Sequence, residues 1–393
     1  MLVLLKLALW FGLTALAAGR PTGTTLISGK AKTAIPPDYV VRQAHDFGVA
    51  CDGAKDDTIS LQNALNALND RQALQLPAGT CLTSNQLRLT GKSNVAVMGA
   101  GKDRTVLLAT NPLHSSFIVS LGSNVQLIGF QVFSPKSNGM KRTSDPNSKG
   151  FLVKNSSGVV LDRIKVRQVA GAGVLFNGVR DSKILNSEVL KSLADAFHVT
   201  GGSENIIAQG NLAEGAGDDG FASIGYEDAI NRNIQFLDNV VRDGWWGSGV
   251  AFAGTDGGKA YRNRIYRSGV AGIRISSERN WKASGSDHLD LQDNYLEGCV
   301  TRARTGHGSV MIFSNFKNIG PNITLRRTTI KNPASGPGVR AYGGRKAGAT
   351  VAATVDDTIM SGVKNPFNIG PNADISRDGK QLASRTRRQS TRQ

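Results

Sequence analysis

The sequence predicts an all-β solenoid, a right-handed single-stranded parallel β-helix. Two observations carry this prediction: an anchor of one small residue followed by alternating apolar residues recurs along the chain, and aromatic residues are few. Only 6% of the 393 residues are aromatic, whereas glycine occurs 46 times. Layered domains fill their cores with large side chains, but a stack of short strands uses Val, Ile and Leu, with Gly and Asn at its corners.

The repeat is regular enough to give a coil length. The anchors are Gly150, Gly173, Ala196, Gly220, Gly249, Gly272, Gly308 and Gly338. The steps between them are 23, 23, 24, 29, 23, 36 and 30 residues, which suits one coil of three short strands with loops inserted in the longer coils. A second strand repeats in phase at Asn205, Asn233 and Asn322. Alternation of period two then places one side chain in the core and the next outside. Leucine-rich repeats have a similar period, but their Leu-rich strand and fixed Asn are missing.

The first 18 residues predict the compartment. They combine one lysine, an apolar run and a small-residue cleavage site at Ala15-Leu16-Ala17, the pattern of a secretory signal peptide. An uncleaved membrane anchor is the alternative. No later stretch approaches the roughly 20 apolar residues that span a bilayer. We therefore expect a secreted protein, extracellular or periplasmic, without a membrane span.

The remaining chain divides into three predicted parts: a lead-in and cap over residues 19–84, the β-helix over 85–370, and a basic disordered tail over 371–393. In the cap, Asp56-Asp57-Thr58 followed by apolar residues at helical spacing predicts an N-capped amphipathic helix. Leu76-Pro77-Ala78-Gly79 predicts a turn before a strand. Cys51 and Cys81 are the candidate disulfide pair, which leaves Cys299 free and buried.

This N-terminal block resembles the cap of the pectin-lyase-like β-helix superfamily. The resemblance implies that a short helix closes the N-terminal end of the solenoid. It also implies that Asp56 and Asp57 are cap residues and not catalytic ones.

The net charge indicates the kind of partner. The chain carries +17, of which the tail and the single leader lysine account for six charges, so the body keeps about +11. A folded body this basic attracts a polyanionic partner through its net positive charge. Because the sequence has no helix-turn-helix, zinc-finger or RNA-binding signature, we expect no nucleic acid partner. We expect a monomer acting on an anionic polysaccharide.

Three aspartates carry the predicted chemistry. Asp195 precedes the anchor Ala196, Asp219 precedes the anchor Gly220, and Asp218 stands beside Asp219. Successive coils stack about 4.8 Å apart, so the three carboxylates should converge on one face. Like charges this close raise at least one pKa, and a protonated acid beside a carboxylate is what glycosidic cleavage requires. Aspartates that cap backbone amides or bind a structural cation are the alternative.

The site resembles the polygalacturonase-type glycoside hydrolases of family 28. The matching segments are Asp195-Ala196-Phe197-His198, Gly217-Asp218-Asp219-Gly220 and Gly272-Ile273-Arg274-Ile275. The resemblance implies that Asp218 is the general acid, that Asp195 and Asp219 activate water with inversion, and that Arg274 binds the sugar. The family's histidine and lysine are Ser248 and Ser276 here, so the family's substrate, galacturonan, does not follow.

Other candidate substrate-binding residues lie close by. His198 and Arg274 have the same outward parity in one column, and Ser248 occupies the position of the family's histidine. Trp246 falls in a loop-lengthened coil beside the acids, where an aromatic face can stack on a sugar. An ordinary surface hydrogen bond for His198 and Arg274, and core packing for Trp246, are the alternatives.

Three functions are consistent with these patterns. The first is a secreted inverting glycoside hydrolase on an acidic or acetylated polysaccharide, with no cofactor and no metal. The second is a uronate lyase or C5-epimerase on the same fold, in which the aspartates would hold Ca²⁺. The third is a glycan-binding β-helix without catalytic activity.

Overall fold

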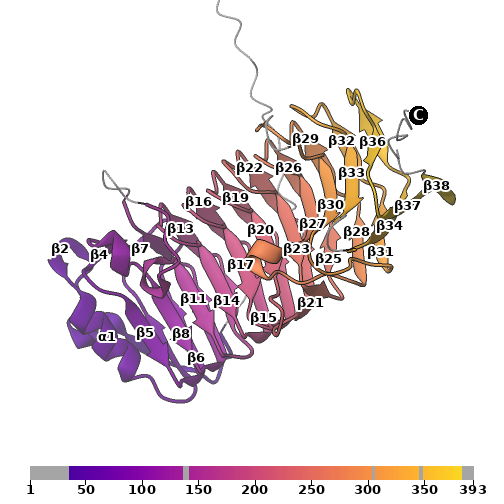
Figure 1. The fold of residues 1–393 in the computed structure, drawn as a ribbon. Coiled ribbons are helices and arrows are strands. Elements are labelled where there is room, and N and C mark those ends of the chain that lie inside the picture. Colours follow the sequence, from indigo (N-terminus) through magenta and orange to yellow (C-terminus); the bar gives the residue numbers. More distant parts are fainter. Residues whose placement is uncertain (1–34, 136–140, 303–305, 345–347, 383–393) are drawn as a thin grey trace, which may run out of the picture. The chain divides into compact units, whose positions relative to one another are not determined.

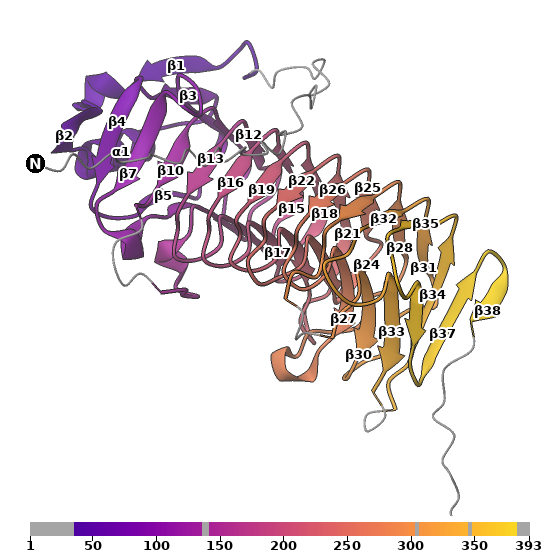
Figure 2. The ribbon, with the colours of Figure 1, turned by 90° about the horizontal axis from the view of Figure 1, so that it is seen from above.

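The computed structural model describes residues 35–135, 141–302, 306–344 and 348–382. The predicted signal peptide and residues 383–393 of the predicted basic tail lie outside these residues. The predicted solenoid is confirmed: three parallel sheets run along the coils, and each coil contributes a strand to each sheet in turn (Figure 1 and Figure 2). No helix among the described residues is long and apolar enough to cross a membrane.

The first sheet, sheet A, begins in the predicted cap and ends in an antiparallel hairpin, β37–β38. Its strands are β1 (Val40–Gln43), β3 (Gln72–Gln75), β6 (Ser93–Met98), β9 (Ser123–Ile128), β12 (Val160–Asp162), β15 (Arg180–Leu185), β18 (Glu204–Gln209), β21 (Asn231–Leu237), β24 (Thr255–Asp256), β25 (Lys259–Tyr261), β28 (Leu289–Gln292), β31 (Ile323–Arg326), β34 (Val351–Asp356), β37 (Ala373–Arg377) and β38 (Lys380–Leu382).

Sheet B follows sheet A in each coil after a sharp corner. Its strands are β2 (Asp52–Asp56), β4 (Gly79–Thr83), β7 (Thr105–Ala109), β10 (Gln131–Phe133), β13 (Lys165–Arg167), β16 (Glu188–Leu190), β19 (Leu212–Glu214), β22 (Val240–Arg242), β26 (Arg264–Tyr266), β29 (Tyr295–Glu297), β32 (Thr329–Lys331) and β35 (Ile359–Ser361).

Sheet C carries the predicted anchors at the start of its strands and positions the site. Its strands are β5 (Leu87–Thr90), β8 (Phe117–Ser120), β11 (Phe151–Lys154), β14 (Val174–Asn177), β17 (Phe197–Thr200), β20 (Phe221–Ile224), β23 (Val250–Ala253), β27 (Ile273–Ser277), β30 (Val310–Ser314), β33 (Val339–Gly343) and β36 (Phe367–Ile369). Within the described residues, four 3₁₀ turns lie outside the sheets: η1 (Ala44–Phe47), η2 (Pro112–His114), η3 (Pro146–Ser148) and η4 (Arg279–Trp281).

The anchors are small because successive coils approach closely there. A Cβ at Gly173 would lie 2.3 Å from Val189 Cγ1 and 2.7 Å from the carbonyl oxygen of Ala196. Inward residues then stack from coil to coil, as in the parallel rings of Phe197 and Phe221, whose centroids are 4.7 Å apart. This stacking makes the apolar core continuous along the solenoid, without the broad packed layers of a layered domain.

The corner between sheets A and B is closed by stacked asparagines. The backbone N–H and the side-chain amide of Asn239 both donate to Asn263 Oδ1, at 3.1 Å each, and Asn239 Nδ2 also donates to the carbonyl oxygen of Ala208. Asn211 and Asn294 repeat the arrangement in the coils on either side. These side chains satisfy buried polar groups that the chain leaves unpaired where it turns.

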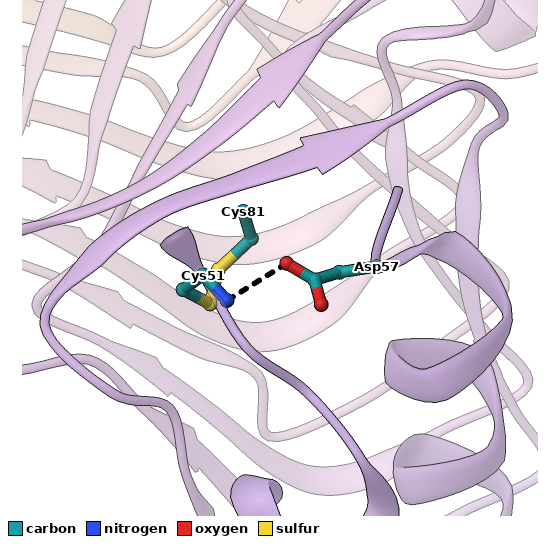
Figure 3. A group of neighbouring side chains, drawn as sticks. All are labelled: Cys51, Asp57 and Cys81. Carbon is teal, nitrogen blue, oxygen red and sulfur yellow. Dashed lines mark hydrogen bonds between the residues drawn. A yellow bond between two sulfur atoms is a disulfide. The ribbon is translucent and has the colours of Figure 1, made fainter. Parts of the chain in front are cut away.

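The N-terminal cap is held by a helix and a disulfide (Figure 3). Helix α1 (Thr58–Asn66) buries Leu61 and Leu65, and Cys51 is bonded to Cys81 as expected. Asp57 precedes the helix but does not cap it with its side chain. Its carboxylate accepts instead from the backbone N–H groups of Ala50 and Cys51, at 2.8 and 2.9 Å. Asp56 accepts from Thr58 N at 2.9 Å in its place.

Two predicted boundaries differ from the structure. Strands of sheets A and B already begin at Val40 and Asp52, inside the predicted lead-in and cap. The hairpin β37–β38 covers residues 373–382, inside the predicted tail. Both ends pair with neighbouring coils because backbone groups at a sheet edge gain hydrogen bonds there. Cys299 is free and buried, as expected.

Candidate active site

Three carboxylates meet on one face of the solenoid, at the start of two adjacent strands of sheet C. Phe197 of β17 pairs with Phe221 of β20, so Asp195 and Asp219 occupy equivalent positions one coil apart. One carboxylate oxygen from each of Asp195, Asp218 and Asp219 lies within 4.8 Å of the other two. The structure therefore brings together the three aspartates that the coil register selects.

Asp195 is held by a histidine from its own strand. Its Oδ2 lies 2.7 Å from Nδ1 of His198, and its Oδ1 accepts from the backbone N–H of Asp219 at 3.1 Å. The other ring nitrogen of His198, Nε2, is buried and has no hydrogen-bond partner in the described part of the chain. His198 therefore orients Asp195 and lines the cleft described below, where substrate would bind.

Asp219 is buried and accepts two strong hydrogen bonds. Its Oδ1 accepts from the backbone N–H of Ser248 at 2.6 Å, and its Oδ2 accepts from Nη2 of Arg274 at 2.7 Å. Arg274 also donates to Glu278, which accepts from the hydroxyl of Ser276. The guanidinium of Arg274 is thus bound between two carboxylates, and the Ser248 side chain is buried beside them.

Asp218 has the most accessible carboxylate of the three and meets a cation from a different loop. Its Oδ2 accepts from Nη2 of Arg142 at 2.6 Å. Arg142 lies in the long connection that leads from β10 to β11, and its side chain is about half exposed. Asp218 is thus the carboxylate best placed to meet a substrate.

These environments separate the three pKa values. Burial, reinforced by the charges of Asp219 and Asp195, raises the pKa of Asp218 to about 7 despite the nearby Arg142. Burial also acts on Asp195, but the charge and hydrogen bond of His198 outweigh it and hold the pKa of Asp195 below its usual value. Burial raises the pKa of Asp219, while the donors Arg274 and Ser248 favour its ionised form. The three carboxyls therefore differ in pKa, with that of Asp195 lowered and those of Asp218 and Asp219 raised.

The site opens into a cleft of about 1220 Å³. His198 and Arg274 line this cleft. They belong to one outward column of sheet C, in which two buried alanines, Ala222 and Ala251, stand between them. Because these side chains are small, Arg274 can reach back across two coils to Asp219. The predicted shared column of His198 and Arg274 is confirmed, although Arg274 is bound to Asp219 and Glu278.

Aromatic side chains lie on both walls of the cleft. Trp246 is 45% exposed and lines the cleft, so it is not a core residue. The guanidinium of Arg302 lies 4.9 Å from its ring centroid. Tyr226 and Trp281, 40% and 71% exposed, come from loops on the other side of sheet C. Trp246 belongs to the lengthened coil, as predicted, and most of the extra residues of this coil lie between Ile224 and Asn231.

The aspartates do not offer a free donor set for Ca²⁺. A cation of the protein already contacts each carboxylate: His198 contacts Asp195, Arg142 contacts Asp218 and Arg274 contacts Asp219. Calcium needs six to eight oxygen ligands, and these positive side chains stand where such ligands or the ion itself would be. The residues present therefore do not fit a calcium site.

Several residues that line the cleft were not predicted from the sequence. Arg142, Tyr226, Glu278 and Trp281 lie in irregular loops that follow no period. Lys149 also lines the cleft, and the repeat could have identified it. It precedes the anchor Gly150 as Asp195 and Asp219 precede theirs, so the same column rule would have selected it.

The family profile described as the right-handed beta helix region matches residues 149–355, which is more than half of the chain. The chain is a member of the right-handed β-helix family. No curated protein sequence matches it significantly. The superfamily part of the predicted resemblance is confirmed, whereas the polygalacturonase-type assignment of the site stays a prediction.

Solved structures share this β-helix at low sequence identity. The catalytic unit of the GH87 α-1,3-glucanase from Streptomyces thermodiastaticus is 17% identical, with a TM-score of 0.67, and the match covers 91% of this chain and 71% of that one. The A-module of the mannuronan C-5 epimerase AlgE4 from Azotobacter vinelandii is 17% identical, with a TM-score of 0.51, covering 86% and 100%. The Streptococcus pneumoniae adhesin PfbA is 14% identical, with a TM-score of 0.57, covering 88% and 96%. At these identities the likeness shows the fold alone.

Proposed function

We propose that this β-helix protein is a secreted glycoside hydrolase that cleaves a polysaccharide with Asp218 as general acid and with Asp195 and Asp219 as the groups that activate water. The observation that carries the proposal is a cluster of three carboxyls within 4.8 Å of one another, in which the pKa of Asp218 is raised to about 7 while that of Asp195 is lowered. A general acid works best when its pKa lies near the working pH.

In the proposed reaction, Asp218 donates its proton to the glycosidic oxygen as the bond to the anomeric carbon breaks. The oxocarbenium-like charge that develops faces Asp195, whose pKa is lowered, and Asp219, which is paired with Arg274. The carboxylates of both would stabilise it electrostatically. One of these carboxylates takes a proton from the water that attacks the anomeric carbon. His198 and Arg274 act as positioning residues, because they hold the carboxylates of Asp195 and Asp219 in place.

The stereochemical outcome is a separate part of the proposal. The resemblance to polygalacturonase-type enzymes supports inversion, whereas carboxyl pairs of inverting enzymes are typically separated by about 6.5–9.5 Å and those of retaining enzymes by about 5 Å. The acid Asp218 lies within 4.8 Å of both partner carboxylates, which is nearer the retaining spacing, so inversion rests on the resemblance alone. Proton NMR of the product at early times distinguishes the two outcomes, and retention of the anomeric configuration would overturn the inverting mechanism.

The experiment that tests the hydrolase uses Asp218→Asn on a panel of neutral and acidic polysaccharides. We expect the release of reducing ends to fall about 100- to 10,000-fold, the usual contribution of a general acid. Asp243→Asn is the matched control, because Asp243 is half exposed and pairs with Arg267 away from the cleft. Full activity of Asp218→Asn would exclude the proposed role of this carboxyl.

A uronate lyase or C5-epimerase is the second candidate, and one observation favours it. The buried Nε2 of His198 has no partner among the described residues and could take a proton from the carbon next to a sugar carboxylate. The mannuronan epimerase among the structural neighbours shares the fold. An unsaturated product absorbing in the ultraviolet, with no new saturated reducing ends, would indicate the lyase. Binding of several glycans without cleavage would instead indicate a binding protein, and the surface adhesin PfbA also shares the fold.

A further inference from the structure

Lys149 has an unusual position in the cleft. It lies two residues before β11, and the pairing of Phe151 with Val174 and of Val174 with Phe197 places Lys149, Ala172 and Asp195 at equivalent positions in three successive coils. By strand spacing the two ends of this set lie about 10 Å apart along the solenoid. Lys149 therefore points into the same column as the carboxylates, two coils before the first of them.

The backbone around Lys149 holds its side chain in that position. Lys149 N donates to Ser116 Oγ at 2.8 Å, and the hydroxyl of Ser115 donates to the carbonyl oxygen of Lys149 at 2.8 Å. The side chain crosses the backbone of the next coil at Gly171, where a Cβ would lie 2.5 Å from Nζ and 2.6 Å from Cδ. The missing side chain at Gly171 thus leaves the space that the lysine fills.

The ammonium of Lys149 has no carboxylate partner among the described residues. The residue is 4% exposed and lines the cleft, yet its hydrogen bond is to the carbonyl oxygen of Thr143, at 3.2 Å. Burial lowers the pKa of Lys149, against the more distant charges of Asp145 and Asp195. By contrast, three other basic side chains that line the cleft, Arg142, His198 and Arg274, each contact a carboxylate.

A buried ammonium with unused donors is costly unless an anion or further acceptors complete its shell. An ammonium offers three donors, and here one of them is used. The space between Lys149 and Asp195 is bordered by the small residue Ala172 and belongs to the cleft. The missing partner would therefore lie next to the reacting carboxylates, where substrate binds.

We propose that Lys149 binds an anionic substituent, a carboxylate or a sulfate, on the sugar next to the bond that the aspartates cleave. The substrate is then an acidic polysaccharide. This inference rests on the proposed function, and it names the substrate class of the same site. Lys149 is a specificity-determining residue in this arrangement, because it contacts the substituent and not the reacting atoms.

The test compares Lys149→Met with the wild type on polygalacturonate, polymannuronate and a sulfated galactan, each beside its carboxyl-reduced or desulfated form. The wild type should prefer one anionic polymer over its uncharged form. In Lys149→Met, kcat/KM on that polymer should fall about 10- to 100-fold, the loss expected for a hydrogen bond to a charged group. Most of the loss should appear in KM, and the preference for the anionic form should disappear. Comparing the carboxylated polymers with the sulfated one identifies the anion that Lys149 binds.

Lys154→Met is the matched control, because Lys154 is exposed at the other end of the same strand. Folding is checked by thermal unfolding, in which an anionic oligosaccharide should raise the midpoint of the wild type but not that of Lys149→Met. A wild type that cleaves neutral polymers equally well would overturn this inference and leave the hydrolase intact. A loss confined to kcat on every substrate would also overturn it. Cleavage of no polymer, with Lys149-dependent binding of anionic ones, would instead overturn the hydrolase.

Discussion

Three chemically identical side chains, Asp195, Asp218 and Asp219, have different partners within a few ångströms of one another. A histidine holds Asp195 ionised, an arginine and a backbone N–H bind Asp219, and Asp218 faces the cleft beside Arg142. Their roles follow from these partners because all three carboxyls would have the same pKa in water. At the scale of the residue, the surroundings of each carboxyl, and not the residue type, decide which of the three acts as the general acid.

This assignment has a pH signature. Asp218 must be protonated to act as the acid, so kcat should fall as the pH rises through about 7, the value to which its environment raises the pKa of Asp218. Arg142 favours the ionised form, so Arg142→Met should raise this pKa further and move the alkaline limb of the kcat profile to higher pH. The measurement is kcat against pH at saturating substrate. Arg180→Met, at an exposed position of β15, should leave the limb in place, and a limb shifted to lower pH by Arg142→Met would contradict the assignment.

At the scale of the element, strand alternation in sheet C does two tasks. Inward positions build the core, and the outward column carries two cleft-lining side chains, His198 and Arg274, with the buried Ala222 and Ala251 between them. Alanine is a modest strand former, so its presence in two central strands reflects the space that Arg274 needs. The sequence shows the column, and the contacts explain its composition.

Filling this space should break the support of Asp219. Ala251 is fully buried, and Ala251→Leu should push the Arg274 side chain away from Asp219, because a packed site cannot absorb three extra carbon atoms without movement. We expect at least a tenfold loss of kcat and a destabilisation of about 1–3 kcal/mol. Urea unfolding and kinetics measure the two effects. Thr324→Leu, at an outward position of β31 in sheet A, is the control, and normal activity in Ala251→Leu would contradict the role given to this column.

At the scale of the whole molecule, each coil contacts mainly the coils beside it, so local constraints stabilise local regions. The disulfide Cys51–Cys81 spans 30 residues in the first coils. Cys51→Ala/Cys81→Ala should therefore destabilise the cap by about 3–4 kcal/mol, the loop-closure contribution for this length. Hydrogen exchange should speed up between residues 52 and 90 and change little in β27 and β30. Equal acceleration in all coils would show instead that the solenoid unfolds as one unit.

The cap also shows where local sequence patterns mislead. Asp56-Asp57-Thr58 predicts a capped helix, and α1 does begin at Thr58. However, the carboxylate of Asp57 turns back to bind the 50–51 backbone, beside the disulfide. A carboxylate accepts from whichever backbone N–H groups the tertiary fold brings near it, and sequence spacing does not reveal which ones these are.

The sequence by itself determined the solenoid, its period, and the column that contains Asp195 and Asp219, because stacking coils repeat the same covalent and steric constraints every turn. That same register contained Lys149, one residue before Gly150. Only the tertiary structure decided that Arg142, Tyr226, Glu278 and Trp281 line the cleft, and that Arg274 is bound between Asp219 and Glu278. These side chains come from loops without a period or reach across coils, so their directions depend on packing between distant segments, which no local pattern records.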